Sequence, residues 1–137
     1  LAKLDEGLEM AEAEKLVLDY IREWVPEERK APLAGNTIGT DRAFLARDMP
    51  TLEGHVHYRN VDVSSIKELA RRWFPRAYFQ APAKHGGHRA LGDIIDSIIE
   101  LQYYRRAVFS AEGPSSDEAK SIAAEVAETY PKQTDED

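Results

Sequence analysis

The chain has 137 residues, of which 42% are hydrophobic and 31% charged, and its formal net charge is −7. These values are typical of one globular domain with a single core, and no run approaches the ~18 consecutive apolar residues of a membrane span. Because the sequence has no cysteine and residues 1–14 lack a signal-peptide pattern, we expect a cytoplasmic protein without disulfides or cysteine-ligated zinc. The acidic balance argues against a protein that grips long nucleic acid along a basic stripe, but it leaves open a substrate with one or two phosphates.

Hydrophobic periodicity predicts alternating helices and short strands, which indicates an α/β fold. In chain order, the predicted elements are a helix over residues 11–25, a strand over 32–36, a helix over 41–49, a short helix over 51–57, a strand over 58–63, a helix over 64–73 and a helix over 89–108. In the last two helices, the apolar residues expected to be buried are Ile66, Leu69, Ala70, Trp73, Leu91, Ile94, Ile95, Ile98, Ile99 and Tyr103.

Two segments lack a strong pattern. Residues 76–87 form an irregular loop that contains Pro and Gly, a kind of loop that is often functional. We expect one folded unit over residues 1–110, followed by a polar, mobile tail over residues 111–137 that contains a weak helix and an acidic end. Two strands do not make an independently stable sheet, so we expect the sheet to continue in residues outside this chain or in another subunit.

A histidine and an aspartate, His88 and Asp93, form the first candidate site. Inside one helix, a five-residue step would place them ~140° apart, so they could share a site only if His88 lies on the entering loop. Gly87 supplies the flexible backbone that this requires. A histidine is a candidate general base, and a carboxylate on a helix is a candidate ligand for a divalent cation. The alternative is a surface histidine and an aspartate that favours the helix dipole.

Two further segments carry polar residues at predicted element boundaries. A strand, a turn with two glycines and a helix place Asp41 where open α/β sheets bind ligands, although Thr40 or Asp41 as a helix cap is the structural alternative. Tyr58 offers a face for stacking on a base, and Arg59 offers a cation for phosphate. Ser64 begins a helix, where anions are favoured, and it could equally be a simple N-cap.

Together these segments resemble oligoribonuclease, a family of exonucleases whose site uses four acidic residues and a histidine (the DEDDh type). The matching stretches are residues 31–45 (APLAGNTIGTDRAFL), 57–73 (HYRNVDVSSIKELARRW) and 88–94 (HRALGDI). The resemblance covers residues 12–109 and implies the C-terminal part of a ribonuclease H-like exonuclease fold. Gly92 departs from the family pattern, because many relatives have a second aspartate there that is not a metal ligand.

The resemblance also implies roles for individual residues. Asp41 and Asp93 would hold two divalent metal ions, Mg²⁺ or Mn²⁺, and His88 would activate the attacking water. Tyr58 would reach a substrate base from the partner subunit of a homodimer. Arg59, with Thr37 and Ser64, would hold the terminal phosphate of a dinucleotide.

The implied function is a 3′-to-5′ exoribonuclease that degrades short single-stranded RNA, dinucleotides above all, to nucleoside 5′-monophosphates, without a membrane partner. The Asp-x-Glu motif of the family's first strand is absent from the sequence, so we expect the chain to be inactive alone. The alternative is a truncated or non-catalytic paralogue that keeps the fold and binds nucleotides or a partner. A DNA-directed proofreading subunit is disfavoured by the segment at residues 57–59.

Overall fold

The computed structural model describes residues 7–129, in which short strands and helices alternate. In chain order the elements are α1 (Met10–Trp24), β1 (Pro32–Gly35), α2 (Ile38–Asp48), α3 (Pro50–His55), β2 (His57–Asp62), α4 (Val63–Trp73), α5 (Pro75–Phe79), α6 (Ala90–Ala107) and α7 (Ser116–Glu128). The predicted α/β class is therefore confirmed, and none of the described helices is both long and apolar enough to cross a membrane.

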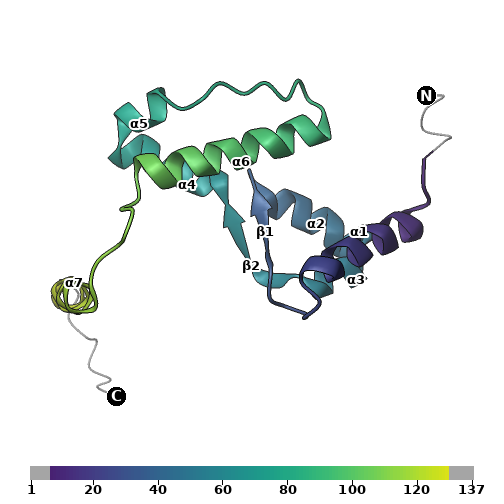
Figure 1. The fold of residues 1–137 in the computed structure, drawn as a ribbon, viewed down its shortest axis with the longest axis horizontal. Helices are drawn as coiled ribbons and strands as arrows, with labels where there is room; N and C mark the ends of the chain where they lie inside the picture. The colour runs from purple at the N-terminus through teal and green to yellow at the C-terminus, as the bar shows by residue number, and fades with distance from the viewer. Residues whose placement is uncertain (1–6, 130–137) are drawn as a thin grey trace, which may run out of the picture.

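The two strands form a parallel pair, with α2 and α3 in the connection between them. Gly35 lies opposite Asp62, and the register is irregular between Pro32 and Leu33. Both arrows point towards α6 and α4, so the two carboxyl ends of the strands lie beside these helices (Figure 1). Within residues 7–129 the sheet has two strands, as the sequence predicted. The carboxyl edge is the place where open α/β sheets bind ligands.

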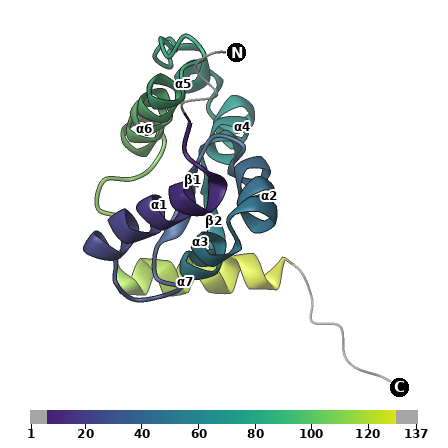
Figure 2. The same cartoon turned by 90° about the vertical axis from the view of Figure 1, so that its right-hand side faces the viewer.

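Fully buried side chains are few and lie where helices contact the strands or each other. The buried apolar residues are Leu18, Ile38, Leu52, Val56, Val63, Ala70 and Tyr104. Helices α1, α2 and α3 gather on one side of the strands, and α7 stands apart beyond the loop that follows α6 (Figures 1 and 2). The core is therefore small, and α7 lies outside it.

The apolar face of α6 is uncovered in the described chain, as expected for a sheet of only two strands, and not buried as the helical pattern alone would predict. The exposed fraction of Leu91 is 70%, and Ile94, Ile95, Ile98 and Ile99 are exposed as well. On α4, Leu69 and Trp73 are also exposed, whereas Ala70 is buried as predicted. A helix of 18 residues is about 27 Å long, while two strands span only about 5 Å between their axes. Such a narrow sheet cannot cover the apolar side of α6.

Several predicted boundaries also change. Helix α2 begins at Ile38, so Asp41 lies in its first turn and does not open it. The N-cap is Thr37 in a left-handed conformation, with no side-chain cap bond, so capping by Thr40 or Asp41 is wrong. The loop after α4 is irregular only from Gln80 onward, because α5 precedes it. Helix α7 agrees with the predicted weak helix, while the acidic end at residues 130–137 lies outside the described residues.

Candidate functional site

A tight turn at the carboxyl end of β1 forms one half of the candidate site. The Thr37 N–H donates to Asp62 Oδ1 and to Ser64 Oγ, each at 3.0 Å, and the Thr37 and Ser64 hydroxyl oxygens lie 3.1 Å apart. Asp62 also accepts from the Ser64 N–H at 3.0 Å and so caps α4. Asp62 therefore has a structural role, because its partners are the backbone N–H groups of Thr37 and Ser64 and the Ser65 hydroxyl at 3.2 Å. The structure brings the predicted pair Thr37 and Ser64 together.

The two candidate metal ligands line one cavity. Asp41 from the first turn of α2 and Asp93 from the first turn of α6 both border a cavity of about 650 Å³ beside the carboxyl end of β1. Asn36 and Asp96 border the same cavity. Both predicted carboxylates are exposed on this side of the described chain, so a ligand could reach them.

His88 lies on the loop that enters α6, as the spacing required. Its φ is +59°, and the preceding Gly87 also has a φ of +59°. Both residues therefore lie in the left-handed region, which is costly for a histidine unless the surrounding structure imposes it. The His88 side chain is exposed and does not line the cavity that Asp41 and Asp93 share.

The loop before His88 is held against α6 by unusually close backbone contact. A Cβ atom on Gly92 would lie 2.6 Å from the Gly86 carbonyl oxygen, and one on Gly86 would lie 2.5 Å from Asp93 Oδ1. Asp96 adds two hydrogen bonds, because its Oδ2 accepts from the N–H groups of His85 at 2.9 Å and Gly86 at 2.7 Å. Gly92 thus touches the loop directly.

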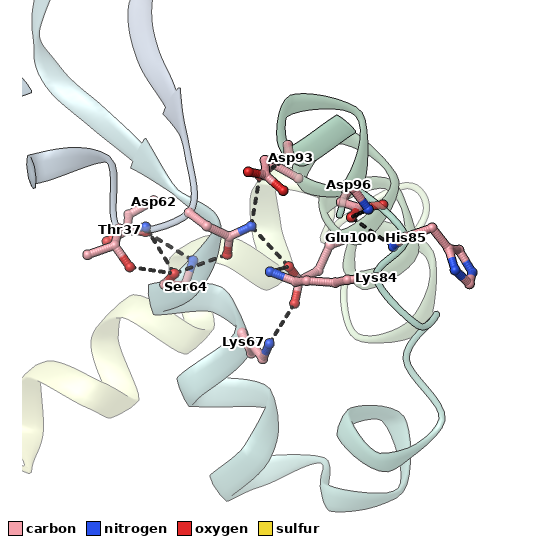
Figure 3. A network of polar contacts seen from close by, with 12 residues as sticks. Thr37, Asp62, Ser64, Lys67, Lys84, His85, Asp93, Asp96 and Glu100 are labelled. Carbon is pink, nitrogen blue, oxygen red and sulfur yellow. Dashed lines mark hydrogen bonds and ion pairs between the residues drawn. The ribbon is translucent and has the colours of Figure 1, made fainter. Parts of the chain in front are cut away.

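A buried carboxylate, Glu100, lies two turns further along α6. Its exposed fraction is 6%, and its oxygens contact Lys67 Nζ at 3.1 Å and Lys84 Nζ at 3.3 Å. The Asn36 amide donates to Glu100 Oε2 at 3.0 Å and to Ser97 Oγ at 2.9 Å (Figure 3). Burial opposes ionisation of Glu100, but hydrogen bonds from Lys67 and Asn36 and the two ammonium charges outweigh it and hold the pKa below its usual value.

Tyr58 and Arg59 lie on β2 with exposed side chains. The Tyr58 ring stacks on His57 at 4.5 Å between centroids, and the Arg59 guanidinium lies 5.5 Å from the Tyr58 centroid. The exposed fraction of Tyr58 is 66%, so its ring is accessible for stacking on a substrate base or for contact with a partner protein. Neither residue lines the cavity of Asp41 and Asp93, and neither contacts the Thr37–Ser64 pair through a hydrogen bond among residues 7–129.

The candidate metal ligands are of the chemical type that binds a divalent cation, but too few of them lie together to hold one. Carboxylate oxygens such as those of Asp41 and Asp93 are ligands that Mg²⁺ and Mn²⁺ prefer. Across the described residues, however, no three aspartate, glutamate or histidine side chains lie close enough together to hold a metal ion. Two carboxylates therefore provide only part of a site for two ions.

Four polar residues of the site were missed by the sequence reasoning: Asn36, Lys84, Asp96 and Glu100. For two of them a signal existed, because Asp93, Asp96 and Glu100 are spaced by three and four residues and so lie along one face of a helix. Acidic residues at this spacing inside an apolar helical run predict a polar contact on that face. Nothing in the sequence marks Asn36 or Lys84 as their partners.

The chain is similar to known exonucleases over most of its length. The chain matches the RNase_T exonuclease family over residues 1–101. It is 66% identical over 125 residues to the oligoribonuclease of Streptomyces coelicolor, which covers 90% of this chain and 62% of that protein. For the oligoribonucleases of Leifsonia xyli and Mycobacterium tuberculosis the identities are 57% and 54% over 131 residues, covering 95% of this chain and 63% and 61% of those proteins. The chain therefore spans less than two thirds of the length of these relatives.

The resemblance to oligoribonuclease is thus confirmed. So is the expected ribonuclease H-like exonuclease fold, represented here by its helix-rich part with two parallel strands. The family match extends across both strands and into α6, so it includes the turn at Thr37, Asp41, the loop at His88 and Asp93. By this match over most of its length, the chain belongs to the exonuclease family.

Proposed function

We propose that this chain forms part of a 3′-to-5′ exoribonuclease that degrades short oligoribonucleotides, dinucleotides above all, to nucleoside 5′-monophosphates. The proposal rests on one observation. Asp41 and Asp93 line one cavity, and the loop that carries His88 lies beside it in close backbone contact with α6. The similar proteins are oligoribonucleases, which supports the choice of RNA as substrate.

In the proposed mechanism, the residues of this chain have separate roles at the scissile phosphate. Asp41 and Asp93 would hold part of a divalent metal site, whose other ligands have to come from outside the described residues. Such ions, Mg²⁺ or Mn²⁺, stabilise negative charge on phosphate oxygens when bound. His88 takes the proton of the attacking water, because its exposed imidazole lies on the loop that enters α6 beside Asp93.

Recognition of a short substrate is assigned to the other half of the site. The Thr37 and Ser64 hydroxyls lie 3.1 Å apart, so both would donate to one phosphate after turning away from their present partners, Ser64 Oγ and Asn36 Oδ1, and Arg59 supplies positive charge. A net charge of −7 is more compatible with binding the terminal phosphate of a short RNA than with binding many phosphates along a long nucleic acid. Tyr58, which is largely exposed, would stack on a base, and we propose that it does so across a homodimer interface.

One observation supports a second function. Because no group of three metal-ligating side chains occurs within residues 7–129, a non-catalytic paralogue that only binds nucleotides would show the same site. The two functions differ in turnover and not in binding, so a cleavage assay separates them.

The experiment compares residues 1–137 with an extended chain, in which residues 1–137 follow the N-terminal segment of the Streptomyces coelicolor relative. We expect the extended chain to release mononucleotides from a 5′-phosphorylated diribonucleotide with Mn²⁺, and residues 1–137 to release none. Asp93→Ala should abolish the release. The matched control is Asp117→Ala, which removes an exposed acid from the first turn of α7, far along the chain from the site.

Two results would contradict the proposal. An extended chain that binds the dinucleotide but never cleaves it would favour the non-catalytic function. Robust cleavage by residues 1–137, lost in Asp93→Ala, would show that the site needs fewer ligands than we infer.

A further inference from the structure

Glu100 is the one buried acid among the described residues, and its contacts come from three separate parts of the fold. Lys67 reaches it from α4, Asn36 from the turn after β1, and Lys84 from the loop before α6. A buried carboxylate is costly unless it is paired and hydrogen-bonded, and here both oxygens have partners. The ionised form of Glu100 therefore requires these three elements to stay together.

On one side, the network leads from Glu100 to the turn that precedes α2. The Asn36 side chain donates to Glu100 and accepts from the Ser64 hydroxyl at 3.0 Å. Ser64 in turn contacts Thr37, and four residues after Thr37 comes Asp41. Figure 3 shows this chain of contacts running from Thr37 and Ser64 to Glu100.

On the other side, the network leads to the loop of His88. Lys84 contacts Glu100, and the next two residues donate their N–H groups to Asp96. Asp96 and Glu100 are four residues apart on α6, so they lie on one face and hold three consecutive loop residues between them. The loop then reaches His88, whose φ of +59° lies in the left-handed region.

We propose that Glu100 is a positioning residue, which fixes the turn at Asn36 against the loop of residues 84–88 and thereby sets His88 relative to Asp41. The proposal rests on the function proposed above, because it assigns Glu100 a part in the same site. Glu100 contacts neither of the two candidate metal ligands through an ion pair or hydrogen bond in the described chain, so it acts through Asn36 and Lys84.

The partners of Glu100 provide a matched comparison. Lys84 connects it to the loop of the site, whereas Lys67 connects it to α4, which carries no residue proposed to take part in catalysis beyond Ser64 at its start. Removing either lysine takes one positive charge from the same carboxylate. A purely structural role for Glu100 predicts similar effects of the two removals on activity, and a positioning role predicts different ones.

The experiment measures kcat and KM for a diribonucleotide in the extended chain carrying Glu100→Gln, Lys84→Met or Lys67→Met. We expect Glu100→Gln and Lys84→Met to lower kcat by about tenfold with KM changed by less than about twofold, as when a reacting group is misplaced without loss of binding. Lys67→Met should keep kcat within about twofold of the wild type. Lys84 is half-exposed, so its variant should fold even if Glu100→Gln does not.

A double variant tests whether the effect passes through His88. In a His88→Ala background, Glu100→Gln should lower kcat by less than about twofold, because residues that act as a unit are not additive. An unchanged kcat in both Glu100→Gln and Lys84→Met, or an equal loss in Lys67→Met, would overturn the proposal. A full tenfold loss that persists in the His88→Ala background would overturn it as well.

Amide hydrogen exchange gives a readout that does not depend on activity. In Glu100→Gln and Lys84→Met, the amides of residues 84–89 should exchange about tenfold faster, and in Lys67→Met they should not. If the wild-type extended chain cleaves no dinucleotide, the proposed function fails while this exchange pattern still tests the link between Glu100 and the loop. Unchanged exchange at residues 84–89 in both variants would refute that link.

Discussion

Replacing Gly92 by alanine should push the loop that carries His88 away from the first turn of α6. The added Cβ would lie 2.6 Å from the Gly86 carbonyl oxygen and 2.7 Å from the Gly86 Cα, whereas ordinary contacts of a Cβ begin at 3.4 Å. The loop backbone must therefore retreat by about 0.8 Å, since neither partner is a flexible side chain. That retreat also disturbs the hydrogen bond from the Arg89 N–H to the Gly86 carbonyl.

The magnitude follows from two opposing effects on the free energy of unfolding. Overpacking costs about 1–3 kcal/mol, and removing a glycine from a helix returns at most about 1 kcal/mol. Gly39→Ala is the matched control, because Gly39 also lies in the first turn of a helix and a Cβ there meets nothing within 4 Å. The two variants should therefore differ by about 1–3 kcal/mol in urea unfolding of the extended chain, with Gly92→Ala the less stable.

Activity should separate the two variants further. A displacement close to 1 Å at a reacting group can lower turnover by about 10²-fold, so we expect kcat for a diribonucleotide to fall by about 10- to 100-fold in Gly92→Ala and to stay unchanged in Gly39→Ala. Equal stabilities and equal kcat values for the two variants would refute the inferred contact between Gly86 and Gly92. A loss of stability without any loss of kcat would refute the inference that this contact positions His88.

Three further outcomes are expected in the extended chain. His88→Ala should lower kcat by about 10²-fold or more and leave dinucleotide binding nearly intact, and wild-type turnover at neutral pH would exclude His88 as the general base. Tyr58→Ala should raise KM by an amount equivalent to about 1–3 kcal/mol of lost stacking, and a fully active monomer in sedimentation at assay concentration would contradict the shared site. Because the pKa of Glu100 is lowered in the folded chain, its stabilising effect is present above the unfolded value of 4.5 and is lost as pH falls below it. Urea unfolding between pH 6 and pH 3 should therefore depend less on pH in Glu100→Gln, and an identical dependence would disprove the contribution.

The resemblance of short motifs named candidate residues, and the fold brings several of them close together. Thr37 and Ser64 are 27 residues apart in the sequence, yet they lie in hydrogen-bond contact, and Asp41 and Asp93 border one cavity. These four residues could be identified from the sequence because each belongs to a short motif, and the order of the motifs along the chain can be seen without a structure. How the Tyr58 and Arg59 side chains meet a substrate could not be derived, because both project into solvent in the described chain.

The sequence by itself determined the order and type of the elements except for the short helix α5, because local periodicity and prolines act over only a few residues. It also showed that His88 and Asp93 could share a site only if His88 lies outside the helix of Asp93, and the structure places His88 on the loop before α6. Tertiary structure decided which faces are buried, and it buried Glu100 while leaving Leu91 exposed, against the local pattern. Burial depends on which surface lies opposite a residue, and only the fold places Asn36, Lys67 and Lys84 around one carboxylate.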